Sequence, residues 1–123
     1  MQSDSSARAE GERKRNGGPL QGFRIVDLTT IGMGPYATQT MGDLGADIIK
    51  VEVPPKGDVM RDTAPGRNPG MASLFFQLNR SKRSLVLDLK QPQGRDALLR
   101  LAKDADVLIF NVRPKGMARL DLS

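Results

Sequence analysis

Residues 23–53, FRIVDLTTIGMGPYATQTMGDLGADIIKVEV, decide the fold. Residues 23–29 are short, apolar and rich in β-branched side chains, and a Gly/Pro cluster follows them, which is typical of a strand. Residues 35–44 begin with a proline, carry apolar side chains at helical spacing and are followed by Gly45, a pattern that predicts a helix. Residues 47–53 predict a second strand, which ends at two prolines that cannot donate to a ladder. This order predicts a strand–helix–strand unit.

The alternation of strands and helices continues along the chain. The further elements are predicted as a long loop over 56–70, a short helix over 71–78, a strand over 84–89, a helix over 92–103 and a strand over 106–112. Strands that alternate with helices form a mainly parallel sheet with helices on its faces. The sequence therefore predicts an α/β, Rossmann-like fold with flanking helices, whose binding edge lies at the carboxyl ends of the strands.

The length of 123 residues suits one domain. Residues 1–18 contain few apolar side chains, so we expect a disordered tail there and the folded part over residues 19–123. The sequence contains neither an apolar run long enough to span a membrane nor the pattern of a signal peptide. We therefore expect a cytoplasmic protein that has no membrane partner.

Two missing residue types narrow the chemistry of the chain. It contains no cysteine and no histidine, which excludes disulfides, thiolate chemistry and the commonest general base and metal ligand, and we expect no metal. The formal net charge is +5, and the stretch between Asp62 and Asp88 carries cations without an acid. An anionic partner is therefore expected. Nucleic acid is not the expected partner, because no aromatic residues are interleaved with the basic ones for base stacking.

The turn after the first predicted strand contains a glycine pattern. Residues 32–37 fit the dinucleotide fingerprint G-x-G-x-x-G/A, and Glu52 stands 20 residues beyond the first glycine. An NAD- or FAD-binding Rossmann domain is therefore an alternative, although Pro35 removes an amide that a pyrophosphate would use. The other interpretation is that these glycines only begin a helix, whose amino terminus still offers free amides to an anion.

Polar side chains follow the ends of the third and fourth predicted strands. Lys90 ends the third strand, Asn111, Val112 and Arg113 end the fourth, and Arg119 lies in the next turn. In a parallel sheet these positions gather at one edge, where the cations and the amide suit a phosphate-bearing ligand. The alternative is that they are ordinary solvated charges and a turn former.

Other charged residues are expected to be structural. The basic run Arg80–Arg83 precedes the third predicted strand, so we expect it near the opposite edge of the sheet, as an interface or ion-pair element. Asp27, Asp88 and Asp106 lie in or beside predicted strands. We expect them to cap or pair with other groups, because no two carboxylates have a spacing that demands acid–base catalysis.

Ordered motifs run from residue 20 to residue 122. They are residues 22–29, Gly34-Pro35, residues 44–52, Gly57-Asp58, residues 79–84, residues 87–90, residues 105–108, Asn111, Arg113-Pro114 and Arg119-Leu120. This series resembles the class III coenzyme A transferases, a family that includes formyl-CoA transferase, carnitine CoA-transferase and α-methylacyl-CoA racemase. An ordered series of this kind is more specific than a single glycine pattern.

The resemblance implies a transferase that moves coenzyme A between carboxylic acids, with acyl-CoA and a carboxylic acid as substrates. It implies covalent intermediates on an aspartate, a chemically reasonable nucleophile, and an interlocked homodimer. The residues implied to bind coenzyme A are Thr30, Ile31, Gly32, Met33, Leu87, Lys90, Asn111, Val112, Arg113, Arg119 and Leu120.

The chain also departs from the pattern of the family. Gly32 and Met33 stand where the family often has Gln-Ala or Leu-Ala, which leaves the acceptor acid open. The family's nucleophilic aspartate comes later than the position that matches Ser123, so we expect a partial large domain that is inactive alone. A racemase of the same family and a non-catalytic binding module remain alternatives. Since parallel sheets are normally covered on both faces, we also expect the chain alone to be poorly stable as a monomer.

Overall fold

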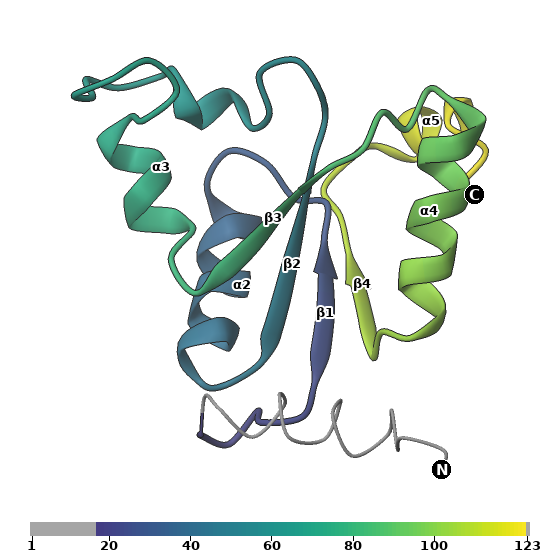
Figure 1. The fold of residues 1–123 in the computed structure, drawn as a ribbon, viewed down its shortest axis with the longest axis horizontal. Helices are drawn as coiled ribbons and strands as arrows, with labels where there is room; N and C mark the ends of the chain where they lie inside the picture. Colours follow the sequence, from purple (N-terminus) through teal and green to yellow (C-terminus); the bar gives the residue numbers. More distant parts are fainter. Residues whose placement is uncertain (1–16, 123) are drawn as a thin grey trace, which may run out of the picture.

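The computed structural model describes residues 17–122, so the tail predicted over residues 1–18 lies mostly outside the described residues. The elements are β1 (Arg24–Asp27), α2 (Met33–Asp43), β2 (Asp47–Glu52), the 3-10 helix η1 (Val59–Arg61), α3 (Ser73–Leu78), β3 (Lys82–Val86), α4 (Pro92–Lys103), β4 (Val107–Ile109) and α5 (Pro114–Arg119). Figure 1 shows this order along the chain.

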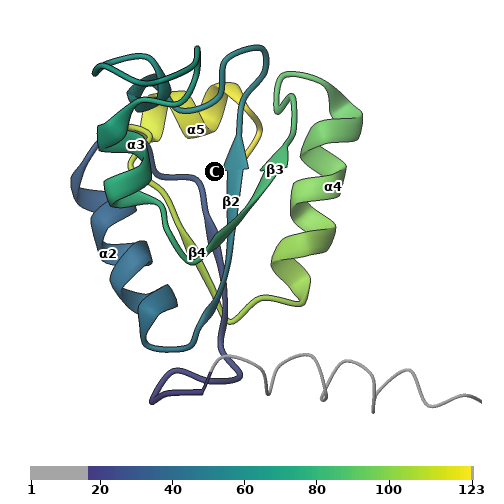
Figure 2. The ribbon, with the colours of Figure 1, turned by 60° about the vertical axis from the view of Figure 1, so that its left-hand side comes forward.

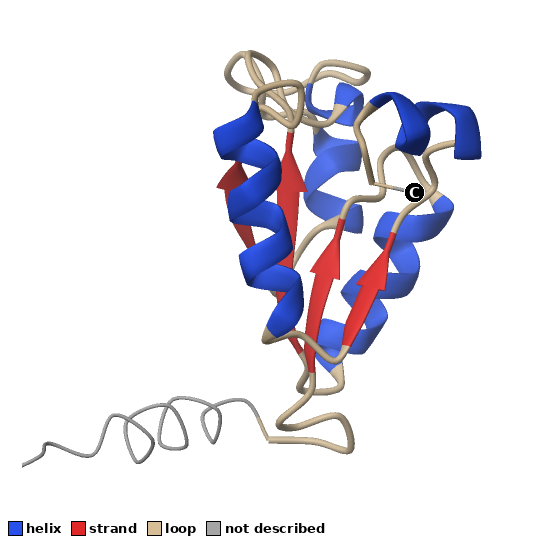
Figure 3. Cartoon of the chain, turned by 90° about the vertical axis from the view of Figure 1, so that its right-hand side faces the viewer, coloured by secondary structure: helices blue, strands red, loops and turns tan. Residues whose placement is uncertain are grey.

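The four strands form one sheet in the order β3-β2-β1-β4. Every pairing is parallel, with Val26 of β1 opposite Ile49 of β2 and Leu108 of β4. Figure 3 shows the strands pointing the same way. The chain leaves β3 at one edge of the sheet and returns as β4 at the other edge, beside β1. The point between β1 and β4 is therefore the topological switch point, where open α/β sheets bind ligands.

Helices cover both faces of the sheet (Figure 2): α2 and α3 lie on one face, α4 lies on the other, and α5 lies at the edge where the strands end. On the α4 face the buried core contains Val26, Leu28, Val51, Leu89 and Leu98. On the α2 face a smaller cluster contains Ile25, Ala46 and Ile48. Neighbouring residues of β1 and β2 thus enter opposite cores, as the alternation of strand side chains requires. The α/β prediction is confirmed.

The end of α2 is built as the sequence predicts. The amide of Gly45 donates to the carbonyl of Gly42 (3.0 Å), and the amide of Ala46 donates to that of Met41 (3.1 Å). These are the two hydrogen bonds of a Schellman motif. Gly45 has a φ of 103° in this turn, a conformation that side chains other than glycine rarely adopt.

The bounds of several elements differ from the prediction. The strand predicted over 84–89 runs from Lys82 to Val86, because it pairs with β2, which ends at Glu52 before the two prolines. The last bond of this ladder joins the amide of Leu87 to the carbonyl of Glu52 (3.0 Å). Lys90 therefore lies in the loop of residues 87–91 between β3 and α4, four residues after the end of the strand, instead of ending the strand.

Further predictions about the elements were also wrong. The strand predicted over 106–112 runs only from Val107 to Ile109, so Asn111, Val112 and Arg113 lie between β4 and α5 and do not end the strand. The helix predicted over 35–44 begins at Met33, and the loop predicted over 56–70 contains η1. Arg119 ends the helix α5 and does not lie in a turn, since Pro114 occupies a first helical position, which proline favours.

Apolar side chains remain exposed on both edge strands. Val86 of β3 is 60% exposed, and Val107 and Leu108 of β4 are 45% and 39% exposed. Exposed edges of this kind can pair with other chains. Among the described residues, no helix is long and apolar enough to cross a membrane.

A substitution of Leu98 tests how much the packing of α4 against the sheet contributes to the stability of the fold. It is 1% exposed in the core, whereas the next residue, Leu99, is 46% exposed. We expect Leu98→Ala to lower the free energy of unfolding by about 3 kcal/mol, through lost burial and the cavity left behind, and Leu99→Ala to lower it by less than about 1 kcal/mol. Urea unfolding followed by circular dichroism measures both. Equal losses for the two variants would contradict this packing.

Candidate functional site

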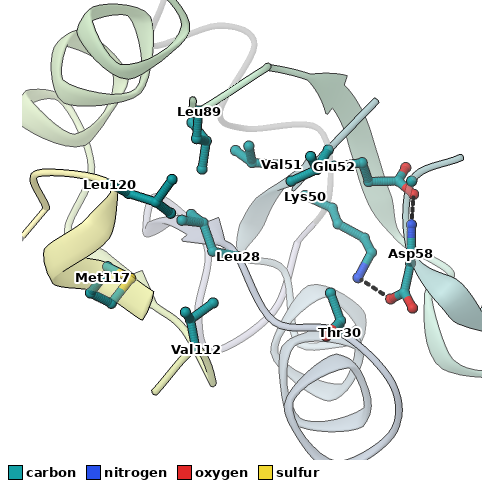
Figure 4. Close-up of a pocket in the computed structure, with 12 residues that line it drawn as sticks. Leu28, Thr30, Lys50, Val51, Glu52, Asp58, Leu89, Val112, Met117 and Leu120 are labelled. Carbon is teal, nitrogen blue, oxygen red and sulfur yellow. Dashed lines mark hydrogen bonds and ion pairs between the residues drawn. The ribbon is translucent and has the colours of Figure 1, made fainter. Parts of the chain in front are cut away.

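A cavity of about 130 Å³ opens at the carboxyl ends of the strands, near the switch point. Figure 4 shows that apolar side chains from several segments line one side of it and polar side chains from β2 and the following loop line the other. The lining residues are Leu28, Thr30, Lys50, Val51, Glu52, Val53, Gly57, Asp58, Leu89, Val112, Met117 and Leu120. A mostly apolar cavity with a few polar groups is typical of sites for small molecules.

Exposed cations stand beside the apolar lining. Leu89, Val112 and Leu120 line the cavity, and each has a basic chain neighbour that is exposed: these neighbours are Lys90, Arg113 and Arg119. None of the ion pairs found among residues 17–122 uses these three cations. Basic residues thus adjoin three of the lining residues in the chain, an arrangement that suits an anionic ligand.

The loop after β1 is held on both sides by side chains. Asn111, which follows β4, accepts a hydrogen bond from the amide of Thr30 (3.1 Å) and donates one to its carbonyl (2.9 Å). On the other side, the amide of Ile31 donates to the carboxylate of Asp58 (3.3 Å). Ile31 has a φ of 76°, which for a β-branched side chain costs about 1–2 kcal/mol. The surrounding bonds must therefore hold this conformation.

Two buried ion pairs lie under this loop. The ammonium of Lys50 is 2.8 Å from the carboxylate of Asp58 and donates to the carbonyl of Thr29 (2.8 Å). The ammonium of Lys82 is 3.1 Å from the carboxylate of Asp27. Burial lowers the pKa of Lys82 to about 8, although the carboxylate of Asp27 opposes this shift.

Glu52 is also engaged in structural bonds. Arg61 donates to both of its carboxylate oxygens (2.7 Å each), Ser84 donates to it as well, and the amide of Asp58 donates at 3.0 Å. Burial by itself raises the pKa of Glu52, but these hydrogen bonds outweigh burial and lower the pKa to about 2. A carboxylate bound in this way is not free to bind a ribose, which removes the acidic residue that the dinucleotide alternative requires.

The glycines of residues 32–37 begin the helix α2, which agrees with the structural interpretation of this pattern rather than with a dinucleotide site. Gly32 is the N-cap of α2. A Cβ on Gly34 would lie 2.4 Å from the Cβ of Thr29, so the glycine allows the helix to pack closely against the end of β1. Pro35 is buried in the first turn.

The implied ligand residues fall into four groups. Thr30, Val112 and Leu120 line the cavity. Ile31, Lys90, Asn111, Arg113 and Arg119 lie in the loops and the helix around it, and Gly32 and Met33 begin α2, with Met33 87% exposed. Leu87 does not line the cavity and packs against the core on the α4 face.

Several lining residues were not predicted from the sequence. Lys50 and Asp58 were not assigned a role, although both lie in motifs on which the family resemblance rests. The alternation within β2 is the signal that points to Lys50: Ile48, Lys50 and Glu52 share one face of a buried strand. A cation on such a face needs a buried partner.

The remaining charged residues have structural contacts. Arg80 and Arg83 form ion pairs with Asp43 and Asp47, which supports the ion-pair interpretation of the basic run. Asp106 accepts from the amide of Arg24 (2.8 Å), and Asp88 accepts from the amide of Lys90 (3.0 Å). Within residues 17–122 no group of acids that could hold a metal ion is found.

Comparison with known proteins identifies similar sequences. The family model described as CoA-transferase family III matches residues 20–123. Succinate–glutarate CoA-transferase of Agrobacterium fabrum is 41% identical over 111 residues, which cover 85% of this chain and 28% of that protein. Formyl-CoA:oxalate CoA-transferase of Rhodopseudomonas palustris is 43% identical over 105 residues, which cover 85% of this chain and 24% of that protein. The chain thus spans about a quarter of the length of these relatives.

Solved structures show the same similarity. The hypothetical protein Rv3272 of Mycobacterium tuberculosis superposes with a TM-score of 0.78 at 41% identity, over 88% of this chain and 29% of that chain. A CAIB/BAIF family protein of Brucella suis superposes with a TM-score of 0.79 at 40% identity, over 86% of this chain and 29% of that chain.

The low pKa of Glu52 makes the stability of the protein depend on pH. The pKa is about 2 in the folded protein and 4.5 without the fold, so the ionised carboxylate stabilises the fold above about pH 4.5. This contribution is lost as the pH falls toward 2. We expect Glu52→Gln to lower the free energy of unfolding by at most about 3 kcal/mol at pH 7 and by progressively less in acid.

Urea unfolding between pH 7 and pH 2.5 measures this difference. Asp104→Asn is the matched control, because Asp104 is an exposed carboxylate at the end of α4. A loss for Glu52→Gln that does not change with pH would refute the assignment.

Proposed function

Because this chain belongs to CoA-transferase family III, we propose that it supplies the coenzyme A-binding part of an enzyme that moves coenzyme A between carboxylic acids. The observation that carries this proposal is the cavity at the switch point, where three apolar lining residues each have an exposed basic neighbour in the chain. Coenzyme A combines phosphates, which suit Lys90, Arg113 and Arg119, with a long arm that is less polar. A volume of about 130 Å³ suits one segment of this molecule, while the charged part would lie outside among the cations.

The proposed reaction proceeds through covalent intermediates on an aspartate. A carboxylate oxygen attacks the acyl carbon of the thioester, the carbon–sulfur bond breaks, and the thiolate of coenzyme A leaves. Both carboxylates that line the cavity have other partners: Glu52 is bound by Arg61, and Asp58 by Lys50. We therefore assign the nucleophile to neither of these two carboxylates.

We also propose that the enzyme acts as a homodimer. The exposed apolar side chains of β3 and β4, among them Val86 and Leu108, support this proposal, because parallel sheets normally have both faces buried. Phe110, which follows β4, is also 45% exposed.

Isothermal titration calorimetry with coenzyme A tests the binding role. We expect Lys90→Ala and Arg119→Ala each to weaken binding about fivefold, because each removes one charged contact to a phosphate. Lys103→Ala is the control, since α4 runs from the strand-end edge to the opposite edge and Lys103 is its last residue. Binding of NAD without binding of coenzyme A would refute the proposal, and an equal loss in the control would refute the location of the site.

The chemical step has a separate test. We expect residues 1–123 alone to transfer no coenzyme A, and the full-length protein to exchange coenzyme A between an acyl-CoA and a carboxylic acid. Exchange of label between the two acids measures transfer, and deuterium uptake at the α-carbon of the acyl group measures racemisation. Transfer by residues 1–123 alone would contradict the first of these expectations, and α-proton exchange without transfer would identify a racemase.

A further inference from the structure

We propose that Asp58 is a positioning residue for the loop of residues 28–32 between β1 and α2: its carboxylate holds Ile31 in the left-handed conformation and so fixes the loop that borders the cavity. This inference rests on the proposed function, because it assigns a role in coenzyme A binding to a residue that acts through the loop.

The conformation of Ile31 does not follow from its own side chain. The residue has a φ of 76°, and it is 56% exposed, so tight packing around its side chain does not impose the conformation. β-Branched residues disfavour this region of backbone space. A restraint on the backbone is therefore needed, and the hydrogen bond from the amide of Ile31 to Oδ1 of Asp58 (3.3 Å) supplies one.

Asp58 is itself fixed from several directions. It is 1% exposed, and its amide donates to the carboxylate of Glu52 (3.0 Å). Its Oδ1 also accepts from the amide of Met60 (3.0 Å), and its Oδ2 is 2.8 Å from the ammonium of Lys50. A carboxylate held in this way presents its oxygen to Ile31 at a defined position.

Consecutive residues of the loop are thus bound by side chains from other segments. Lys50 of β2 binds the carbonyl of Thr29, Asn111 after β4 binds both the amide and the carbonyl of Thr30, and Asp58 binds the amide of Ile31. Figure 4 shows Thr30 next to the Lys50–Asp58 pair at the polar end of the cavity. Asp58 is the member of this set that contacts the strained residue.

The consequence for binding follows from the population of loop conformations. If only a fraction of the molecules has the loop in the binding conformation, the measured dissociation constant rises by the inverse of that fraction. Without Asp58, Ile31 relaxes toward negative φ. We expect Asp58→Ala to weaken coenzyme A binding about tenfold, which corresponds to a binding-competent fraction of about one tenth.

A double-mutant cycle with Ile31→Gly separates positioning from a general structural role. Glycine adopts positive φ without a steric cost, so the loop no longer needs Asp58 to the same extent. We expect Asp58→Ala to weaken binding about tenfold in the wild-type background and less than about threefold in the Ile31→Gly background, measured by calorimetry with coenzyme A. Asp62→Ala is the control: its carboxylate binds the amide of Gly70, away from the loop, and binding should not change.

A measurement without ligand keeps the proposal testable if Asp58→Ala does not fold. In the wild-type protein the amide of Ile31 should exchange with deuterium at least about tenfold more slowly than an unprotected amide, because it donates to a buried carboxylate. Additive effects in the cycle, or an unprotected Ile31 amide, would overturn the role of Asp58. A wild-type chain that protects this amide but does not bind coenzyme A would instead overturn the proposed function and leave the restraint on the loop in place.

Discussion

The buried ion pair between Lys50 and Asp58 is the interaction on which the candidate site depends. Neither charge contacts solvent to any extent, so each needs the other, and removal of one partner from such a pair costs about 3–5 kcal/mol. The same two groups bind the loop after β1, Lys50 at the carbonyl of Thr29 and Asp58 at the amide of Ile31. Side chains of β2 and of the segment after it therefore restrain the loop after β1.

This arrangement requires a sheet that has an apolar core on one face and buried polar and charged groups on the other. Val26 of β1 and Leu28, which comes directly after the strand, enter the apolar core under α4, whereas Asp27 and Thr29 face α2. There Asp27 accepts from the hydroxyl of Thr38 (2.6 Å) and pairs with Lys82. Buried charges of this kind contribute less to net stability than an apolar core of similar volume would. What they provide is defined geometry, because each hydrogen bond restricts how the strand ends and the helix α2 can shift.

The sequence predicted most of the elements, since their signals are local. The period of α4 and the glycine that ends α2 depend on neighbouring residues, and the structure confirms both. The bounds of β3 could not be predicted in this way, because they depend on where its partner β2 reaches the prolines. The residues of the site were likewise predictable only where their signals are local. Val112 and Leu120 could be placed from strand ends and the family resemblance, but the burial of Lys50 depends on Asp58, which comes from a separate loop.

The topology explains why the apolar and cationic parts of the site meet. The chain crosses the sheet between β3 and β4, so the loops after these strands approach the switch point from opposite sides. Each loop contributes an apolar residue to the lining of the cavity, and a basic residue adjacent to it in the chain is exposed to solvent. Leu89, which lines the cavity, and the exposed Lys90 are one such pair. The loop after β1 lies at the same edge of the sheet, and bonds to Lys50, Asp58 and Asn111 fix its backbone before any ligand arrives. A loop ordered in advance loses less conformational entropy on binding, so more of the interaction energy of the ligand is retained as affinity.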